Sequence, residues 1–258
     1  MSNISSQAIV SPDAVIGNNV SIGPFSIIEA GVVIGDNSEI HSSVLIHKNT
    51  TLAKGVKVYH SAVLGNQPQD LKFTGEETTL TIGENTTIRE FATISRGTAA
   101  RKTTVIGNNC FIMAYVHIPH DSIIGNNVIL SNTVNMGGHV VIDDWAILGG
   151  MVGVHQFVRI GAHAFIAFSS RVTQDVPPYL LAGGEPVGYK GLNLVGLKRR
   201  GFTDEQIKNI KNTYSLIYGS VYNTSDALKA VKDTVPLTDE VNNIITFIEK
   251  SERGIIRK

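Results

Sequence analysis

Residues 106–130 read IGNNCFIMAYVHIPHDSIIGNNVIL, and the spacing of their aliphatic side chains decides the fold. A large aliphatic residue returns at every sixth position, at Ile106, Ile112, Ile118, Ile124 and Leu130. The residue two places before each of them is small or β-branched. Side chains two apart on a strand share a face, so both positions can point inward in a short strand. The stretch therefore predicts one short strand in every six residues.

The same repeat runs from Ile4 to Val172, and only Asp70, Glu76 and Ala100 interrupt it. Self-similarity at a fixed period is typical of solenoids. A strand and a turn every six residues predicts a parallel β-helix with three walls, in which three repeats complete one coil of eighteen residues. Gly and Asn often follow the aliphatic residue, and we interpret them as turn residues that tolerate positive φ.

The interruptions predict two excursions from the prism. Asp70 and Glu76 would face inward within 68–79, so we interpret this segment as an excursion loop of two repeats that rejoins the prism in phase. A shorter excursion surrounds Ala100, within Gly97 to Thr104. Loops on a regular solenoid usually carry function.

The repeat stops before Pro177-Pro178, and helix signals follow. Thr203 and Gln206 have the spacing of a capping box, and Ser225-Asp226 and Thr238-Asp239 are further N-cap candidates. We therefore predict a β-helix over 1–178, then a connector and a C-terminal α-helical domain over 179–258.

Composition excludes several classes of protein. The 22 basic and 22 acidic side chains balance, so no bulk charge points to nucleic acid. Cys110 is the single cysteine and falls on an inward position, which predicts a packed thiol and no disulfide framework. No signal peptide and no stretch of about 20 apolar residues is visible. We expect a cytoplasmic protein with no membrane span.

Four of the histidines gather at one edge of the predicted prism. Because one coil has eighteen residues, residues eighteen apart are expected to stack in a vertical column. One such column is Leu64, Ile82, Ala100, Ile118, Met136, Val154 and Val172. Beside this column lie His117, His120, His139 and His155. The long excursion would start from the same edge three coils before Ile118, and His47 would lie four coils before it. His41, His60 and His163 map to other edges and are expected to be structural.

Two chemistries fit such a cluster. Three imidazoles and a water form a catalytic zinc site, whereas one imidazole that titrates near neutrality suits general-base catalysis. A base needs an orienting carboxylate, and Asp121 directly follows His120. Spacing alone leaves the choice open.

Several motifs in the same order resemble one family. They are Ile118-Pro119-His120-Asp121, Gly137-Gly138-His139, Val154-His155-Gln156-Phe157, Gln174 to Tyr179, Gly196 to Phe202, Gln69-Asp70-Leu71-Lys72 and Arg96-Gly97-Thr98. Together they are similar to the acyl-carrier-protein-dependent UDP-N-acetylglucosamine O-acyltransferases. These are hexapeptide-repeat enzymes with a left-handed β-helix that start lipid A synthesis. The resemblance covers essentially the whole chain.

The resemblance implies a role for each matching residue. His120 would be the general base for the sugar 3-hydroxyl, Asp121 would orient it, and the Gly138 N–H would stabilise the oxyanion. Substrate contacts are implied for Gln69, Asp70, Lys72, His117, His139, His155 and Gln156, and nucleotide contacts for Asn193, Arg199 and Arg200. The implied partners are acyl carrier protein, which donates a 3-hydroxyacyl chain, and UDP-N-acetylglucosamine. The resemblance also implies a homotrimer with sites between neighbouring prisms, and neither a cofactor nor a metal.

Three positions depart from the family pattern. Ser95 stands where many members have histidine, and Val195 where some have an acidic residue near the uridine. Phe168 occupies the position of the acyl-length ruler, where glycine admits long chains, so we expect a shorter 3-hydroxyacyl chain. The sequence does not fix the length of the acyl chain. It also leaves open whether the acceptor is N-acetylglucosamine or a 3-amino analogue, and which surface docks acyl carrier protein.

Three other functions are possible on the same fold. A zinc carbonic anhydrase would have wider histidine spacing than His117 to His120, and stoichiometric zinc would favour it. The related N-acyltransferase normally has an additional N-terminal uridine-binding domain, whereas the repeats here start at Ile4. A non-catalytic scaffold would keep its full function without His120.

Overall fold

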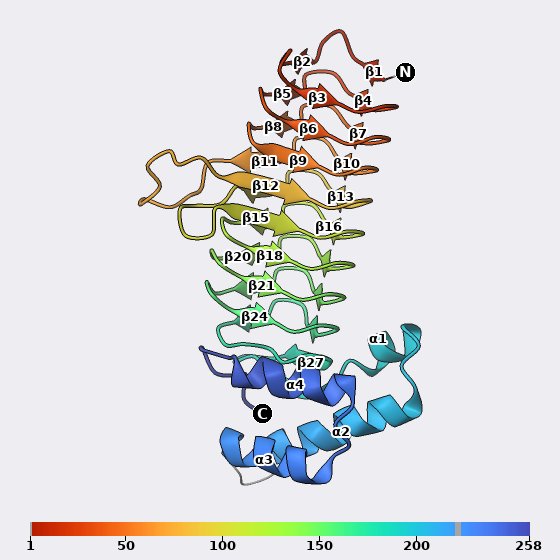
Figure 1. Ribbon diagram of the computed structural model, residues 1–258, viewed down its shortest axis with the longest axis vertical. Coiled ribbons are helices and arrows are strands. Elements are labelled where there is room, and N and C mark those ends of the chain that lie inside the picture. Colours follow the sequence, from red (N-terminus) through yellow and green to blue (C-terminus); the bar gives the residue numbers. More distant parts are fainter. Residues whose placement is uncertain (1, 220–222) are drawn as a thin grey trace.

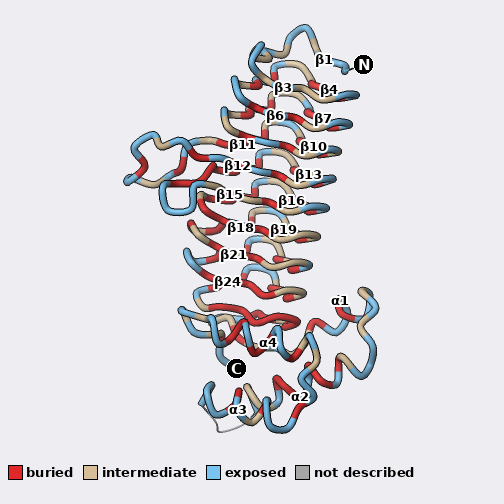
Figure 2. Tube along the Cα trace, in the orientation of Figure 1, coloured by how far each residue is buried: buried red, intermediate tan, exposed pale blue. Residues whose placement is uncertain are grey.

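The protein is a three-walled prism of short parallel strands with helices at one end (Figure 1). The computed structural model describes residues 2–219 and 223–258. Successive coils pair in register, so that Ile106 lies beside Ile124 on one wall. From Ile22 to Val172 the inward aliphatic residues are buried, and the tube in Figure 2 is red at buried positions along the walls. Burying each of them contributes roughly 1.5–3 kcal/mol. The parallel β-helix predicted from the six-residue repeat is confirmed.

Each coil gives one strand to each wall. The first wall contains β1 (Asn3–Ile4), β4 (Ser21–Ile22), β7 (Glu39–Ile40), β10 (Lys57–Val58), β13 (Thr87–Ile88), β16 (Phe111–Ile112), β19 (Ile129–Leu130), β22 (Ile147–Leu148), β25 (Phe165–Ile166), β27 (Leu180–Gly183) and β28 (Gly188–Leu192). The second wall contains β2 (Ile9–Val10), β5 (Ile27–Ile28), β8 (Leu45–Ile46), β11 (Val63–Asn66), β14 (Thr93–Ser95), β17 (His117–Ile118), β20 (Asn135–Met136), β23 (Gly153–Val154) and β26 (Arg171–Val172). The third wall contains β3 (Val15–Ile16), β6 (Val33–Ile34), β9 (Thr50–Leu52), β12 (Thr79–Ile82), β15 (Thr103–Ile106), β18 (Ile123–Ile124), β21 (Val141–Ile142) and β24 (Arg159–Ile160).

Both excursions leave the prism at the edge between the second and third walls, which we call the loop edge. Residues 67–78 connect β11 to β12, and residues 96–102 connect β14 to β15. Figure 1 shows the two loops projecting from the same side of the prism, one below the other. His120, His139 and His155 lie on turns of this edge after β17, β20 and β23, as their spacing predicted.

The predicted vertical column is wrong at two positions. Leu64 pairs with Ile94, and Ile94 pairs with Ile118, so these steps are 30 and 24 residues instead of 18. Ile82 lies on the third wall, and Ala100 lies in the short excursion. The physical reason is that the excursions use twelve and six residues that form no coil.

The long excursion therefore lies nearer to the histidines than the sequence predicts. The excursion 67–78 leaves the prism two coils before β17 rather than three, and His47 lies three coils before it rather than four. His41 and His60 lie between the first and second walls and His163 between the third and first, so their predicted assignment to other edges is confirmed.

The glycine after the aliphatic residue has a different purpose from the one predicted. Positive φ falls two residues later, for example at Asn109 (φ 55°), and Gly107 does not have it. A Cβ on Gly107 would lie 2.6 Å from the carbonyl carbon of Gly125 in the next coil. Glycine is needed because successive coils approach closely at this position.

Residues 179–258 begin with a last strand of the prism and continue as helices. β27 pairs in parallel with β25, and β28 pairs antiparallel with β27. The helices are α1 (Leu194–Arg199), α2 (Asp204–Gly219), α3 (Thr224–Thr234) and α4 (Asp239–Glu249), and they cover the end of the prism in Figure 1. The domain division at residue 178 stays a prediction.

The helix caps follow the sequence signals in part. Thr203 and Gln206 exchange both hydrogen bonds of the predicted capping box. Thr238 occupies the N-cap position of α4. Asn223 caps α3 by accepting the N–H of Asp226 at 2.9 Å, so the prediction of an N-cap at Ser225-Asp226 is wrong. No helix within the described ranges is long and apolar enough to cross a bilayer.

Candidate active site

A cavity of about 860 Å³ opens at the loop edge, between the long excursion and the turns that follow β17, β20 and β23. We call it the loop-edge pocket. Its lining brings together several residues that the sequence proposed for one site, namely Gln69, Asp70, Lys72, His117, His120, Gly138, His139 and Gln156. Their roles stay predictions, but their convergence from four separate segments makes this the candidate active site.

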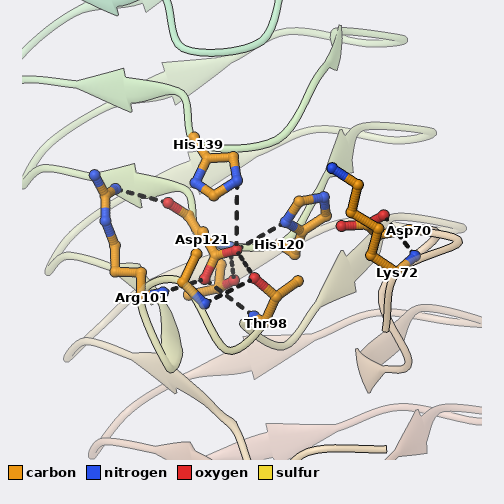
Figure 3. A network of polar contacts seen from close by, with 9 residues as sticks. Asp70, Lys72, Thr98, Arg101, His120, Asp121 and His139 are labelled. Carbon is orange, nitrogen blue, oxygen red and sulfur yellow. Dashed lines mark hydrogen bonds and ion pairs between the residues drawn. The ribbon is translucent and has the colours of Figure 1, made fainter. Parts of the chain in front are cut away.

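His120 and Asp121 form a hydrogen-bonded pair. Nδ1 of His120 lies 2.8 Å from Oδ2 of Asp121, whose side chain is fully buried (Figure 3). A carboxylate can only accept hydrogen bonds, so Nδ1 has the proton and Nε2 keeps a free lone pair. The hydroxyl of Thr98 donates to the same carboxylate oxygen. The imidazole is thus held in the tautomer that a general base requires.

The short excursion and the start of β15 supply the other groups that hold Asp121. Oδ1 accepts the N–H groups of Thr98 and Arg101 at 3.0 and 3.2 Å. The guanidinium of Arg101 donates to the carbonyl oxygen of Asp121 at 2.7 Å, and Thr104 accepts the Asp121 N–H at 2.9 Å. Burial alone would raise the pKa of the Asp121 carboxyl, but the hydrogen bonds from Thr98 and His120 outweigh it and lower the pKa. Asp121 is therefore an anion near neutral pH.

Two further histidines border the pair. The ring of His139 stacks on Phe157 with centroids 4.5 Å apart, and it meets His120 edge-on at 5.1 Å. Burial lowers the pKa of His139 more than Asp121 raises it. Nδ1 of His117 lies 2.8 Å from the Thr93 hydroxyl, and burial also lowers its pKa. Both rings are therefore neutral near pH 7, suited to hydrogen bonding with an uncharged substrate group.

Gly138 packs directly against the His120 ring. A Cβ on Gly138 would lie 2.5 Å from Cε1 and 2.7 Å from Nε2 of His120. The residue is buried, and no acceptor among the described residues takes its N–H. The residue that packs against the His120 ring therefore has an amide N–H without a partner among the described residues.

The long excursion is tied to the prism at its root. Arg96 donates to the carbonyl oxygen of Gly65 at 3.1 Å, and its guanidinium lies over the Phe73 ring at 5.3 Å. Near the loop tip, Asp70 accepts the backbone N–H of Lys72 at 3.0 Å. Figure 3 shows Lys72 and Asp70 on the His120 side of the site, with Arg101 on the opposite side.

The other proposed contacts lie outside the loop-edge pocket. His155 borders a smaller hollow on the second wall, beside Asn135 and Met136. Asn193 and Arg199 line a pocket of about 390 Å³ on the first wall. Arg200 donates to Nδ1 of His163 at 3.2 Å.

Two of the proposed nucleotide contacts already have partners within the chain. Asn193 is buried, accepts the N–H of Gly196 at 3.1 Å and donates to the carbonyl oxygen of His163 at 3.0 Å. The Arg200 guanidinium also covers the Trp145 ring at 5.1 Å. Arg199 is exposed, and it is the one of the three with its charge open to solvent.

The residues that depart from the family pattern differ in exposure. Ser95 is buried, and its hydroxyl accepts from the Asn66 amide at 3.1 Å, at the root of the long excursion. Val195 is exposed on the rim of the first-wall pocket. Phe168 is 67% exposed, and its ring lies over Gly150, where a Cβ would be 3.3 Å away. The ring therefore projects from the edge between the first and second walls.

The site also has the ligand types of a metal centre. Single ligand atoms of His120, Asp121 and His139 lie within 4.8 Å of one another. Both oxygens of Asp121 already accept hydrogen bonds, however, and Nδ1 of His120 is one of the donors. A bound metal would have to break this network, so the geometry favours the base over the metal ligand.

Sequence reasoning missed Arg101 and the contact function of Thr98. Both lie in the short excursion, 20 and 23 residues before Asp121, a separation that the coil of eighteen does not reveal. It also missed Phe157, whose stacking on His139 needs the observed ring orientations.

The described part of the site combines an oriented imidazole, an unpaired amide N–H and a polar pocket on a hexapeptide-repeat prism. This combination suits transfer of an acyl group to a hydroxyl, in which a base removes a proton and a donor stabilises the oxyanion. The fold and the site define a hexapeptide-repeat acyltransferase.

Comparison with known proteins identifies the family. A family model described as bacterial transferase hexapeptide matches residues 13–48 and 103–138, and one described as UDP-N-acetylglucosamine O-acyltransferase, domain 2, matches residues 175–256. A relative from Chlorobaculum tepidum, named acyl-acyl-carrier-protein–UDP-N-acetylglucosamine O-acyltransferase, is 58% identical over 96% of this chain and 94% of its own. A relative of the same name from Paracidovorax citrulli is 49% identical over 100% of both chains.

A solved structure agrees with these relatives. The UDP-N-acetylglucosamine acyltransferase from Bacteroides fragilis 9343 superposes with a TM-score of 0.97 at 48% identity, over 98% of this chain and 99% of that one. The expected fold class, a left-handed parallel β-helix with C-terminal helices, is thereby confirmed. The chain belongs to the family of acyl-acyl-carrier-protein–UDP-N-acetylglucosamine O-acyltransferases.

Proposed function

We propose that this protein transfers a 3-hydroxyacyl chain from acyl carrier protein to the 3-hydroxyl of UDP-N-acetylglucosamine, the first step of lipid A synthesis. The observation that carries the proposal is the His120–Asp121 pair, in which the carboxylate is buried and the imidazole lines the loop-edge pocket beside Gly138. The full-length likeness to relatives named for this reaction supports the choice of substrates.

In the proposed reaction, Nε2 of His120 takes the proton from the sugar hydroxyl. The oxygen attacks the thioester carbon, and the N–H of Gly138 stabilises the resulting oxyanion. Collapse forms the ester and breaks the carbon–sulfur bond, and the leaving thiolate takes the proton back from His120. The ionised Asp121 stabilises the imidazolium in between. His120 thus takes up one proton and gives it back, and no other acid or base is needed.

The proposed substrate contacts divide between the loop edge and the first wall of the prism. The sugar and the acyl group would meet Gln69, Asp70, Lys72, His117, His139, His155 and Gln156 near the loop edge. The nucleotide would meet Asn193, Arg199 and Arg200 near the opposite wall. Because one prism presents these sets on different faces, a complete site requires two chains, and a homotrimer with sites between neighbours satisfies this requirement. The setting would be the cytoplasm.

Phe168 would set the acyl length. Its exposed ring stands at the position of the family's ruler and occupies space that glycine would leave open to a longer chain. The preferred donor is therefore a shorter 3-hydroxyacyl chain.

The direct test is product analysis with the purified protein. Acyl carrier proteins loaded with 3-hydroxyacyl chains of several lengths are mixed with UDP-N-acetylglucosamine or its 3-amino analogue, and the products are weighed by mass spectrometry. The expected product gains one 3-hydroxyacyl group, and reactions without the sugar are the control. Failure to acylate either sugar with any donor would contradict the proposal. A requirement for stoichiometric zinc would favour the metal alternative.

A further inference from the structure

A second pocket, of about 270 Å³, lies where the C-terminal segment meets the third wall. It shares His139 and Phe157 with the loop-edge pocket, so the two cavities are neighbours. Its basic lining residues are Arg101, Arg159, Lys250 and Arg253. We call it the arginine pocket. Figure 3 shows Arg101 on the far side of Asp121 from His120 and Lys72, which separates this pocket from the proposed base.

Backbone carbonyl groups hold the three guanidinium groups in place. Arg101 donates to Asp121 at 2.7 Å, Arg159 to Lys250 at 3.2 Å, and Arg253 to Thr173 at 3.3 Å. Arg159 also lies over the Phe247 ring at 4.7 Å. A guanidinium has five N–H donors, and a carbonyl bond uses only one. The three groups are therefore oriented and keep most of their donors free.

The positive charge of this pocket is not neutralised by ion pairs. Within the described residues, none of the four basic side chains forms a salt bridge. Asp175 also lines the pocket, but its oxygens accept the backbone N–H of Arg159 at 2.8 Å and the Ser251 hydroxyl at 2.7 Å. Glu252 is exposed at the rim. Among the residues that line the pocket, four cations thus face two carboxylates, and outside the lining the charge of Arg159 acts on Asp143.

We propose that the arginine pocket binds a phosphate-type oxyanion. Planar guanidinium groups match phosphate oxygens with paired hydrogen bonds, and a partly enclosed pocket strengthens the attraction. The anion could be free phosphate or the phosphodiester that joins a carrier protein to its thiol arm. The second source rests on the proposed function, because the pocket then anchors the acyl donor next to the site where its thioester reacts.

Direct binding of inorganic phosphate tests the pocket without any acyl transfer. We compare the full chain with the double variant Lys250→Gln/Arg253→Gln by titration calorimetry. The matched control Lys211→Gln/Arg257→Gln removes the same two charges at exposed positions outside the pocket. We expect the first double variant to bind phosphate at least about tenfold more weakly and the control to bind it normally. Equal affinity in all three proteins, or no binding to the wild-type chain, would overturn the proposal.

Thermal unfolding of each variant checks that the fold is intact. If the double variant unfolds, Lys250→Gln alone replaces it, because the Lys250 ammonium has no hydrogen bond or ion pair with residues 2–219 or 223–258. Lys211→Gln is then the control.

Donor kinetics distinguish the two sources of the anion. If the pocket holds the donor's phosphodiester, the double variant raises KM for the acyl carrier protein substrate about tenfold and leaves kcat unchanged. KM for an acyl-pantetheine thioester without phosphate would be unaltered. If phosphate binding weakens but KM for the carrier protein does not change, the pocket is a site for free phosphate. If the wild-type chain binds phosphate but transfers no acyl group, the proposed function is rejected and the phosphate site is retained.

Discussion

Nδ1 of His120 and Oδ2 of Asp121 lie 2.8 Å apart, and Thr98, 23 residues earlier, donates its hydroxyl to the same oxygen. The two neighbours in sequence can face each other because Asp121 adopts a φ of +58° in the turn after β17. The short excursion then encloses the carboxylate. A loop that interrupts the repeat thus orients the proposed base.

The hydroxyl of Thr98 should tune the pair. In Thr98→Val the carboxylate loses a donor, so the pKa of Asp121 rises and its bond to protonated His120 strengthens. We expect the acidic limb of the kcat/KM profile to move to higher pH and kcat to fall about 10- to 100-fold. Thr98→Ser keeps the hydroxyl and should retain the wild-type limb. Superimposable profiles for the valine and serine variants would argue against this role.

Gly138 cannot accept a side chain without displacing His120. The Cβ of Gly138→Ala would lie 2.5 Å from the imidazole, so we expect acyl transfer to fall about 100-fold or more through misplacement of the base. Gly153→Ala is the matched control, because its Cβ would meet nothing within 4 Å. Steady-state rates and thermal unfolding midpoints of both variants check the prediction. Equal activity in the two variants would show that the close packing is unimportant.

Phe168 should limit the acyl chain. In Phe168→Gly the space above Gly150 opens, so preference should move to donors longer by two or more methylene groups, by at least about tenfold in relative kcat/KM. Phe25→Gly removes another exposed ring on the same edge and serves as control. An unchanged order of donors in Phe168→Gly would remove the basis for assigning a short chain.

His163 should make stability depend on pH. Burial, followed by the charge of Arg200, lowers its pKa to about 4. The unfolded value is about 6.5, so the stabilisation from neutral His163 is complete above pH 6.5 and is lost as the pH falls toward 4. In denaturant unfolding, wild type should lose about 2 kcal/mol of stability relative to His163→Phe over this range, because phenylalanine does not titrate. Parallel curves would contradict the assignment.

The fold was predictable because a six-residue repeat is a local pattern that survives interruption. The predicted vertical column was wrong at Ile82 and Ala100 because each excursion removes whole repeats from the prism. The repeats that follow keep the six-residue phase, so the removal leaves no break in the pattern. The signal was nevertheless present: Asp70, Glu76 and Ala100 mark the displaced repeats. Omitting those repeats takes the column from Leu64 through Ile94 to Ile118, as the pairing shows.

The site was predictable where residues lie on turns and unpredictable where loops fold back. The positions of His120 and His139 follow from their place in the coil. The approach of Arg101 to Asp121 depends on the path of the short excursion. The arginine pocket requires the C-terminal segment to return to Arg159, 91 residues from Lys250 in sequence, which no local pattern encodes.

The central claim is that His120 removes the proton from the sugar hydroxyl. The most direct test is the rate of acyl transfer by His120→Ala at saturating acyl carrier protein substrate and UDP-N-acetylglucosamine, with the fold checked by thermal unfolding. General-base catalysis predicts that kcat falls by about 10²–10⁴-fold while the unfolding midpoint stays near the wild-type value. A folded His120→Ala protein that transfers the acyl group at the wild-type rate would contradict the account.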